Sequence, residues 1–160
     1  MKVILGLFML FSFQSYTQQN WKTIYENELE FTIPNGYSLE MIKGVKTYSY
    51  NDEKNVFGVL VFEHDENIVG KKRIKNFYKG ILDSFIKEDN EVVLYDLYEL
   101  SEYIVAKSIQ KNSSIFIEAH LIHINKVNYL AYSEYLVDSS QIALDIKDSF
   151  FDSFVVNHKN

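Results

Sequence analysis

Apolar residues follow two periods along this chain, and the order of the two periods constrains the fold more than any other feature. Residues 29–63 alternate between apolar and polar side chains or form short β-branched runs, as strands do. Residues 71–86 place an apolar side chain at every third or fourth position, which is the stripe of an amphipathic helix. Strand-like runs return in residues 92–137, and a second helical stripe reaches about Ser153. The order predicts four strands, a helix, four strands and a helix.

Strands in consecutive runs, with only two helices among them, indicate an α+β fold. We expect a mostly antiparallel β-sheet covered by two main helices, an α/β/α-type sandwich. Residues 111–113 and Asn125-Lys126 supply hairpin turns, so the last three strands should form an antiparallel meander. The alternative is a lipocalin-like barrel with a terminal helix, but an up-and-down barrel has no place for the helix in mid-chain.

The first seventeen residues have a different composition from the rest. Lys2 precedes an apolar stretch of eleven residues, 3–13, and Ser15-Tyr16-Thr17 offers a cleavage site between small residues. The stretch is shorter than the roughly 20 residues that a transmembrane helix needs. We therefore predict a signal peptide in residues 1–17, a single domain in residues 18–160, and a periplasmic or secreted location. The alternative is a buried N-terminal strand or helix.

Composition narrows the functional classes. The chain has no cysteine, which excludes disulfides, thiolate metal sites and cysteine nucleophiles. Its formal charge of −6 argues against nucleic-acid binding, because such binding depends on basic surfaces that neutralise phosphates. No later stretch is long and apolar enough to anchor the chain in a membrane after the signal peptide is removed.

The sequence carries no known catalytic pattern. It has no Gly-x-Ser-x-Gly, His-Glu-x-x-His, phosphate-binding loop or Gly-x-Gly-x-x-Gly. Strand alternation places Glu118 and His120 on one face and His123 on the other, so the two histidines cannot chelate one ion. His64-Asp65-Glu66 follows a strand and is better explained as a solvated strand end than as a cation site. We expect no enzyme, no metal and no cofactor, although a hydrolase with a dispersed site stays an alternative.

Basic residues crowd the first turn of the mid-chain helix. They are Lys71, Lys72, Arg73 and Lys75. The positive end of the helix dipole lies here and favours acidic residues, so these basic side chains are electrostatically unfavourable for the helix. An anionic partner surface or a lipid headgroup would explain their presence, and a solvated basic face is the alternative.

Tyrosines gather in the late strands. They are Tyr95, Tyr98, Tyr103, Tyr129, Tyr132 and Tyr135. Alternation separates Tyr129 and Tyr135 on one face of the sheet from Tyr132 on the other. Tyrosine is enriched at protein interfaces, so Tyr129, Tyr132 and Tyr135 are candidate binding residues. Ordinary sheet packing, with the hydroxyl groups at the rim, is the alternative.

Several segments together resemble the Mog1/PsbP-like superfamily over most of residues 21–156. These are Tyr25-Glu26-Asn27, the run Leu-Glu-Phe-Thr-Ile-Pro-Asn-Gly-Tyr at 29–37, and Asp148-Ser149-Phe150 in the closing helix, with the mid-chain helix and the late meander. The resemblance implies a small binding or accessory protein, since members include photosystem subunits, a small-GTPase partner and bacterial effector chaperones. A signal peptide departs from the cytosolic branches, so no functional residue is carried over.

These observations predict an exported, non-catalytic binding or accessory domain. Its expected partner is an envelope or secreted protein, bound through the tyrosine-bearing sheet face or the basic helix start. The alternative function is a carrier or sensor of a small lipid or glycan ligand, held in a pocket between the sheet and the helices.

Overall fold

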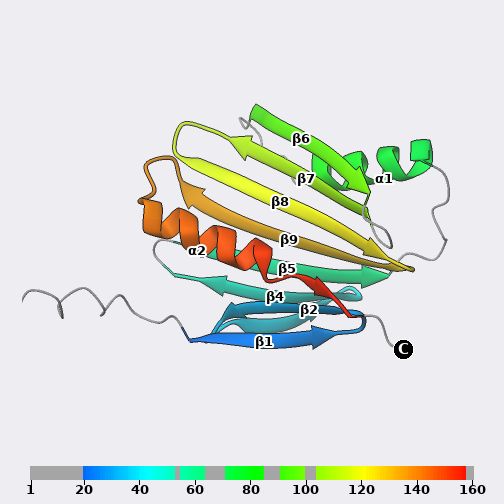
Figure 1. The fold of residues 1–160 in the computed structure, drawn as a ribbon, viewed down its shortest axis with the longest axis horizontal. Helices are drawn as coiled ribbons and strands as arrows, with labels where there is room; N and C mark the ends of the chain where they lie inside the picture. Colours follow the sequence, from blue (N-terminus) through cyan, green and yellow to red (C-terminus); the bar gives the residue numbers. More distant parts are fainter. Residues whose placement is uncertain (1–19, 53–54, 64–70, 85–90, 100–103, 158–160) are drawn as a thin grey trace, which may run out of the picture.

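The computed structural model describes residues 20–52, 55–63, 71–84, 91–99 and 104–157 (Figure 1). The predicted signal peptide, His64-Asp65-Glu66 and Tyr103 lie outside the described residues, as do the side chains of Lys71, Tyr95 and Tyr98. Within the described part, no helix is both long and apolar enough to cross a membrane.

The described elements follow the predicted order, with one added strand at each end. They are β1 (Trp21–Glu26), β2 (Leu29–Pro34), β3 (Ser38–Ile42), β4 (Val45–Asn51), β5 (Val56–Glu63), α1 (Lys71–Ser84), β6 (Glu91–Glu99), β7 (Ile104–Lys111), β8 (Ile115–Ile124), β9 (Val127–Leu136), α2 (Gln141–Asp152) and β10 (Val155–Val156). β1 and β10 are not predicted by the sequence analysis. β10 has only two residues, and the polar side chains of β1 hide its alternation.

The described strands form two antiparallel sheets. The small sheet has the order β1-β2-β10, and the large sheet has the order β3-β4-β5-β9-β8-β7-β6. This confirms the predicted class, a mostly antiparallel α+β fold with two helices. The meander of β7, β8 and β9 is also confirmed. The large sheet ends at β3 and β6, which are not neighbours, so the barrel alternative does not hold for the described strands.

The two faces of the large sheet carry different cores. On one face, the small sheet and α2 cover a cluster that includes Phe31, Phe57, Tyr129 and Phe150. On the other face, Tyr78 of α1 packs on a cluster of Ala106, Ala119, Leu121 and Leu130. The two helices therefore contact opposite faces of the large sheet, as the ribbon shows (Figure 1).

Helix α2 begins after a serine that caps it. Ser140 is its N-cap, and the Ser140 side chain accepts a hydrogen bond from the backbone N–H of Ala143. The expected apolar stripe is only partly buried, since Phe150 lies in the core but Ile142 in the first turn is exposed.

Candidate functional site

Tyr129 belongs to the core and not to a surface. Its side chain is fully buried, and its hydroxyl donates a hydrogen bond to the backbone oxygen of Glu26, 3.2 Å away. Burial raises the pKa of the Tyr129 hydroxyl. The small sheet covers the face on which Tyr129 lies, and alternation within β9 cannot predict that cover. The expectation that Tyr129 contacts a partner is therefore corrected.

Tyr132 lies on the opposite face and is half-buried, with a pKa that burial raises. Its ring packs directly over Gly58 of the neighbouring strand β5. A β-carbon added to Gly58 would lie 2.6 Å from the Tyr132 hydroxyl oxygen and closer still to two ring carbons. Tyr132 thus fills the space that the missing side chain of Gly58 leaves, and its first role is in packing.

Tyr135 is half-buried, like Tyr132, and burial raises the pKa of its hydroxyl. Its ring stacks on Phe116 of β8, with centroids 5.4 Å apart and planes at 14°. The Lys147 ammonium of α2 lies 5.3 Å from the Tyr135 ring, and the Lys111 ammonium lies 5.7 Å from the Phe116 ring. Cations at these distances are attracted by the ring faces. We call these four residues the aromatic–lysine cluster.

A buried carboxylate holds this cluster in place. Glu118 is 2% exposed. Its Oε1 lies 2.6 Å from Lys107 Nζ and 2.8 Å from His120 Nε2, and its Oε2 accepts a hydrogen bond of 2.8 Å from Lys147 Nζ. Since Lys147 also lies over Tyr135, the Glu118 carboxylate fixes the cation that contacts the ring.

Two opposing effects set the ionisation of Glu118. Burial alone would raise its pKa, but the contacts with His120, Lys107 and Lys147 outweigh burial and lower the pKa to about 2. For Lys147, burial would lower the pKa, and the contacts with Asp148 and Glu118 raise it to about 12. Glu118 is therefore a carboxylate at neutral pH, surrounded by cations, and holds no proton to transfer.

The histidines of β8 separate as alternation predicts. His120 shares the face of Glu118 and stacks on Phe151 of α2, with centroids 4.0 Å apart. His123 points to the other face, where its Nδ1 lies 2.8 Å from Asn128 Oδ1. Among the residues that the structure describes, no three metal-ligating side chains come together.

Exposed apolar side chains follow Tyr135 at this end of the large sheet, and strand alternation points Leu136 to the opposite face of β9 from Tyr135. Leu136, Val137 and Ile142 are each between 43 and 46% exposed, although all three are large and apolar. A hollow of about 220 Å³ opens beside them, lined in part by Ile115, Tyr135 and Leu136. We call Tyr135, Leu136, Val137 and Ile142 the β9–α2 surface.

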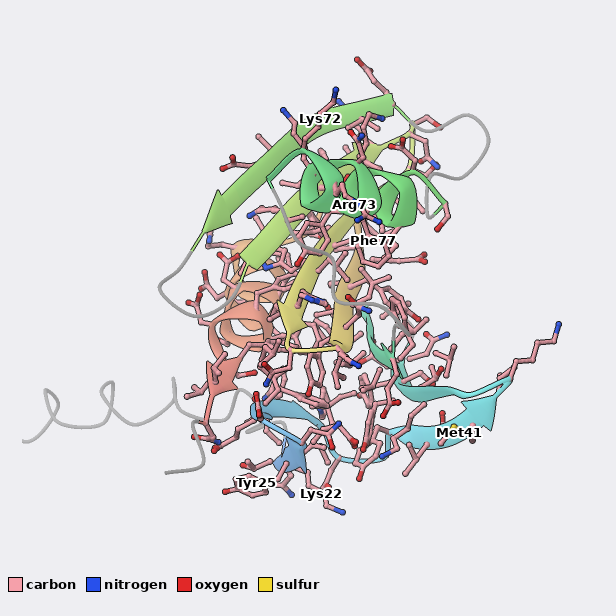
Figure 2. The ribbon with its side chains drawn as sticks, turned by 90° about the vertical axis from the view of Figure 1, so that its right-hand side faces the viewer. Lys22, Tyr25, Met41, Lys72, Arg73 and Phe77 are labelled. Atoms are coloured by element: carbon pink, nitrogen blue, oxygen red, sulfur yellow. The ribbon has the colours of Figure 1, made fainter. Side chains whose placement is uncertain are left out.

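The predicted basic residues lie elsewhere in the molecule. Lys72, Arg73 and Lys75 are exposed at the start of α1, on the face opposite to α2 (Figure 2). The structure therefore does not join the basic helix start to Tyr135, and the two predicted surfaces are separate.

A second hollow, of about 590 Å³, lies at the other end of the large sheet from the β9–α2 surface. It is lined by residues 26–27, Met41, residues 43–46, residues 61–63 and Val127. Glu26, buried at its wall, accepts hydrogen bonds from Lys46 and from the Tyr48 hydroxyl. Burial, followed by the hydrogen bond to Glu26, raises the pKa of Tyr48. Sequence patterns missed this site because its lining comes from five separate segments.

Comparison with known proteins supports the fold. No protein-family model matches the sequence, and no curated protein matches it. The solution structure of cyanobacterial PsbP (CyanoP) from Synechocystis matches with a TM-score of 0.61 and 15% identity, over 89% of this chain and 95% of that one. The yeast Ran-binding protein Mog1p matches with a TM-score of 0.49 and 12% identity, over 86% of this chain and 96% of that one. A crystal structure from Bacteroides thetaiotaomicron gives a TM-score of 0.48 and 13% identity, over 89% of this chain and 50% of that one. The agreement with CyanoP over nearly the whole of both chains shows that this chain has the Mog1/PsbP-like fold.

Proposed function

We propose that this chain is an exported, non-catalytic accessory domain that binds an envelope or secreted protein through the β9–α2 surface. One observation carries the proposal. The Tyr135 ring contacts both Phe116 and Lys147, and three exposed apolar residues follow it in the chain. The superfamily resemblance, which implies binding and accessory roles, supports the same function.

The chemistry of this surface suits a protein partner. Protein interfaces are enriched in aromatic residues, and the best anchors are rigid side chains at the centre of the contact. The stack on Phe116 and the ion pair of Lys147 with Glu118 restrict the Tyr135 ring before any partner arrives. A preorganised ring loses less conformational entropy on binding, which favours affinity.

Substitutions on the β9–α2 surface test this function. We expect Leu136→Glu combined with Ile142→Glu to weaken capture of a specific envelope protein by about tenfold or more, because both introduce charge into an apolar contact. Quantitative mass spectrometry of proteins cross-linked to the chain measures the change. Met41→Glu, at the other end of the sheet, is the matched control and should leave capture unchanged. Equal capture by all three forms, or no specific protein captured, would overturn the proposal.

A small-ligand carrier is the second candidate. The hollow of about 590 Å³ near Glu26 has the volume of typical ligand pockets, roughly 300–1,000 Å³. Met41, Val45, Val61 and Val127 give it apolar walls. Saturable stabilisation by a small lipid or glycan, with no protein captured, would favour this function over the first.

We also propose that residues 1–17 are removed on export and that residues 18–160 form one α/β/α-type sandwich. Mass spectrometry of periplasmic and secreted material should then find a chain that begins near Gln18, because export signals are cleaved after small residues. Leu7→Arg, which interrupts the apolar stretch, should leave the full chain inside the cell. Met1 on most of the exported molecules would contradict the proposal.

A further inference from the structure

Acidic side chains border the β9–α2 surface. Asp138 lies in the turn that follows β9, and Asp145 lies one turn beyond Ile142 in α2. Both carboxylates are exposed. Asp52 and Glu134 line the hollow of about 220 Å³ at the same end of the sheet. We call Asp52, Glu134, Asp138 and Asp145 the acidic rim.

The hollow joins the rim to the apolar side chains. β5 begins at Val56, opposite Glu134, so β9 runs past its neighbour by two residues, Tyr135 and Leu136. Both of these residues line the hollow, although their side chains belong to opposite faces of β9. A segment that lies across the end of β9 can therefore contact side chains from both faces.

Hydrogen bonds orient two carboxylates of the rim. Asp52 Oδ1 accepts a hydrogen bond of 2.7 Å from the backbone N–H of Asn55, and Asp52 Oδ2 accepts one of 3.0 Å from the Tyr50 hydroxyl. Asp145 Oδ1 accepts a hydrogen bond of 2.8 Å from Gln141 Nε2. These donors are uncharged, so the bonds position each carboxylate without neutralising it.

Basic side chains oppose the acidic rim only in part. The Lys147 side chain is 12% exposed, and its ammonium already contacts Glu118 at 2.8 Å and Asp148 at 2.7 Å. Lys111 is exposed, but it lies opposite Glu91 in the register of β6 and β7. Opposite charges on paired strands attract each other. The residues that the structure describes at this end therefore present a negative border around an apolar surface.

The sign of this border selects the occupant. Nucleic acids and anionic lipid headgroups carry the same sign as the acidic rim and are repelled by it. A second copy of this chain, paired through the same face, would bring a second acidic rim into the contact. A basic segment with apolar side chains complements both the rim and the exposed apolar residues.

We propose that the β9–α2 surface docks a basic amphipathic segment of the partner protein. This inference rests on the proposed function and adds the chemistry of the partner. Apolar side chains of the segment pack on Leu136, Val137 and Ile142, and its lysine or arginine side chains reach the acidic rim. Long basic side chains suit this arrangement, because their aliphatic stems cover apolar surface while their charges stay in water.

Two synthetic peptides test this chemistry with the full chain. One is an amphipathic peptide of leucine and lysine, and the other has glutamate in place of every lysine. Fluorescence anisotropy of the labelled peptides should show saturable binding of the leucine–lysine peptide and at least about tenfold weaker binding of the leucine–glutamate peptide, because the rim attracts one and repels the other. Equal binding of the two peptides would overturn the choice of a basic segment.

Charge reversal locates the binding. Asp138→Lys with Asp145→Lys should raise the Kd of the leucine–lysine peptide by about tenfold or more, mainly through slower association, and added salt should reduce the difference. Glu40→Lys with Glu63→Lys is the matched control, since it reverses as many charges at the other end of the sheet. Glu40 lies on β3, whose five residues are all exposed, and Glu63 is exposed at the end of β5. An equal effect of the two double substitutions would mean attraction to net charge alone and would overturn the docking site.

These outcomes separate the inference from the proposed function. Capture of an envelope protein that depends on Leu136 and Ile142, with no preference for the leucine–lysine peptide, would overturn the inference and leave the proposed function intact. Peptide binding that the charge reversal at Asp138 and Asp145 removes, with no envelope protein captured, would support the basic preference and overturn the proposed function.

Discussion

Replacing Glu118 with glutamine is expected to lower the free energy of unfolding by about 3 kcal/mol, because the change leaves two lysines around a buried neutral group. Glu118 is 2% exposed, and both Lys107 and Lys147 lie against its carboxylate oxygens. Removing one partner of such a group costs more than the pair contributes, since the remaining charges lose their compensation. Urea unfolding at pH 7 measures the difference.

Asp148→Asn is the matched control for this substitution. The Asp148 carboxylate contacts the same Lys147 at 2.7 Å, but its side chain is 61% exposed. Exposed ion pairs contribute little, so we expect a loss of about 0.5 kcal/mol or less. A loss for Glu118→Gln as small as that for Asp148→Asn would contradict the role of Glu118 as the anchor of the aromatic–lysine cluster.

The same carboxylate gives the protein a defined acid sensitivity. The folded-state pKa of Glu118 is about 2, below its ordinary value of 4.5. A carboxyl group with a lowered pKa stabilises the fold fully above its unfolded-state value and loses that contribution as the pH falls toward the folded-state value. The stability difference between the wild type and Glu118→Gln should therefore be largest above pH 4.5 and shrink toward pH 2. A difference that stays constant over this range would show that packing, and not charge, causes the loss.

The second large effect is expected at Gly58. Gly58→Ala should lower the free energy of unfolding by about 2 kcal/mol, because its methyl group would overlap the ring of Tyr132. Gly80→Ala is the matched control, since Gly80 is exposed on α1 and a β-carbon there meets nothing within 4 Å. Alanine favours a helix over glycine, so Gly80→Ala should stabilise the protein by up to about 1 kcal/mol.

A double-mutant cycle identifies the cause. In a Tyr132→Ala background the space over Gly58 is empty, so Gly58→Ala should cost close to nothing there. The coupling between the two sites should be about 1–2 kcal/mol, within the range of contacting residues. An equal cost in both backgrounds would mean that the β5 backbone at Gly58, and not the Tyr132 ring, sets the requirement for glycine.

Local patterns predicted most of the elements but not their arrangement. Strand β5 spans residues 56–63, as its β-branched and aromatic run predicts. A short apolar run of this composition is typical of a strand buried in a sheet. The order of the large sheet carries no such local signal. β5 pairs with β9, about seventy residues later, and only tertiary packing selects this neighbour. The small sheet covers Tyr129 only as a result of that tertiary packing. Alternation within β9 therefore could not predict whether Tyr129 is buried.

The candidate site was predictable only in part. Alternation placed Glu118 beside His120, but Lys107 and Lys147 come from a neighbouring strand and from α2. The strand register would have found Lys107, which pairs with His120 across β7 and β8. Nothing in the sequence pattern indicates that α2 places Lys147 over Tyr135. The exposure of β3 was missed for a related reason, since its apolar residues resemble those of any half-buried strand.

The position of β9 also sets the order in which the chain can fold. This strand lies between β5 and β8 in the large sheet, yet it is one of the last strands to be synthesised (Figure 1). A nascent chain that ends before residue 127 holds the two outer parts of the sheet without the strand that joins them. Pairing across such long sequence separations is slow, because loop closure must precede the contacts that reward it. In the exported protein that we propose, translocation can therefore begin before the large sheet is stable. Folding then does not compete with translocation.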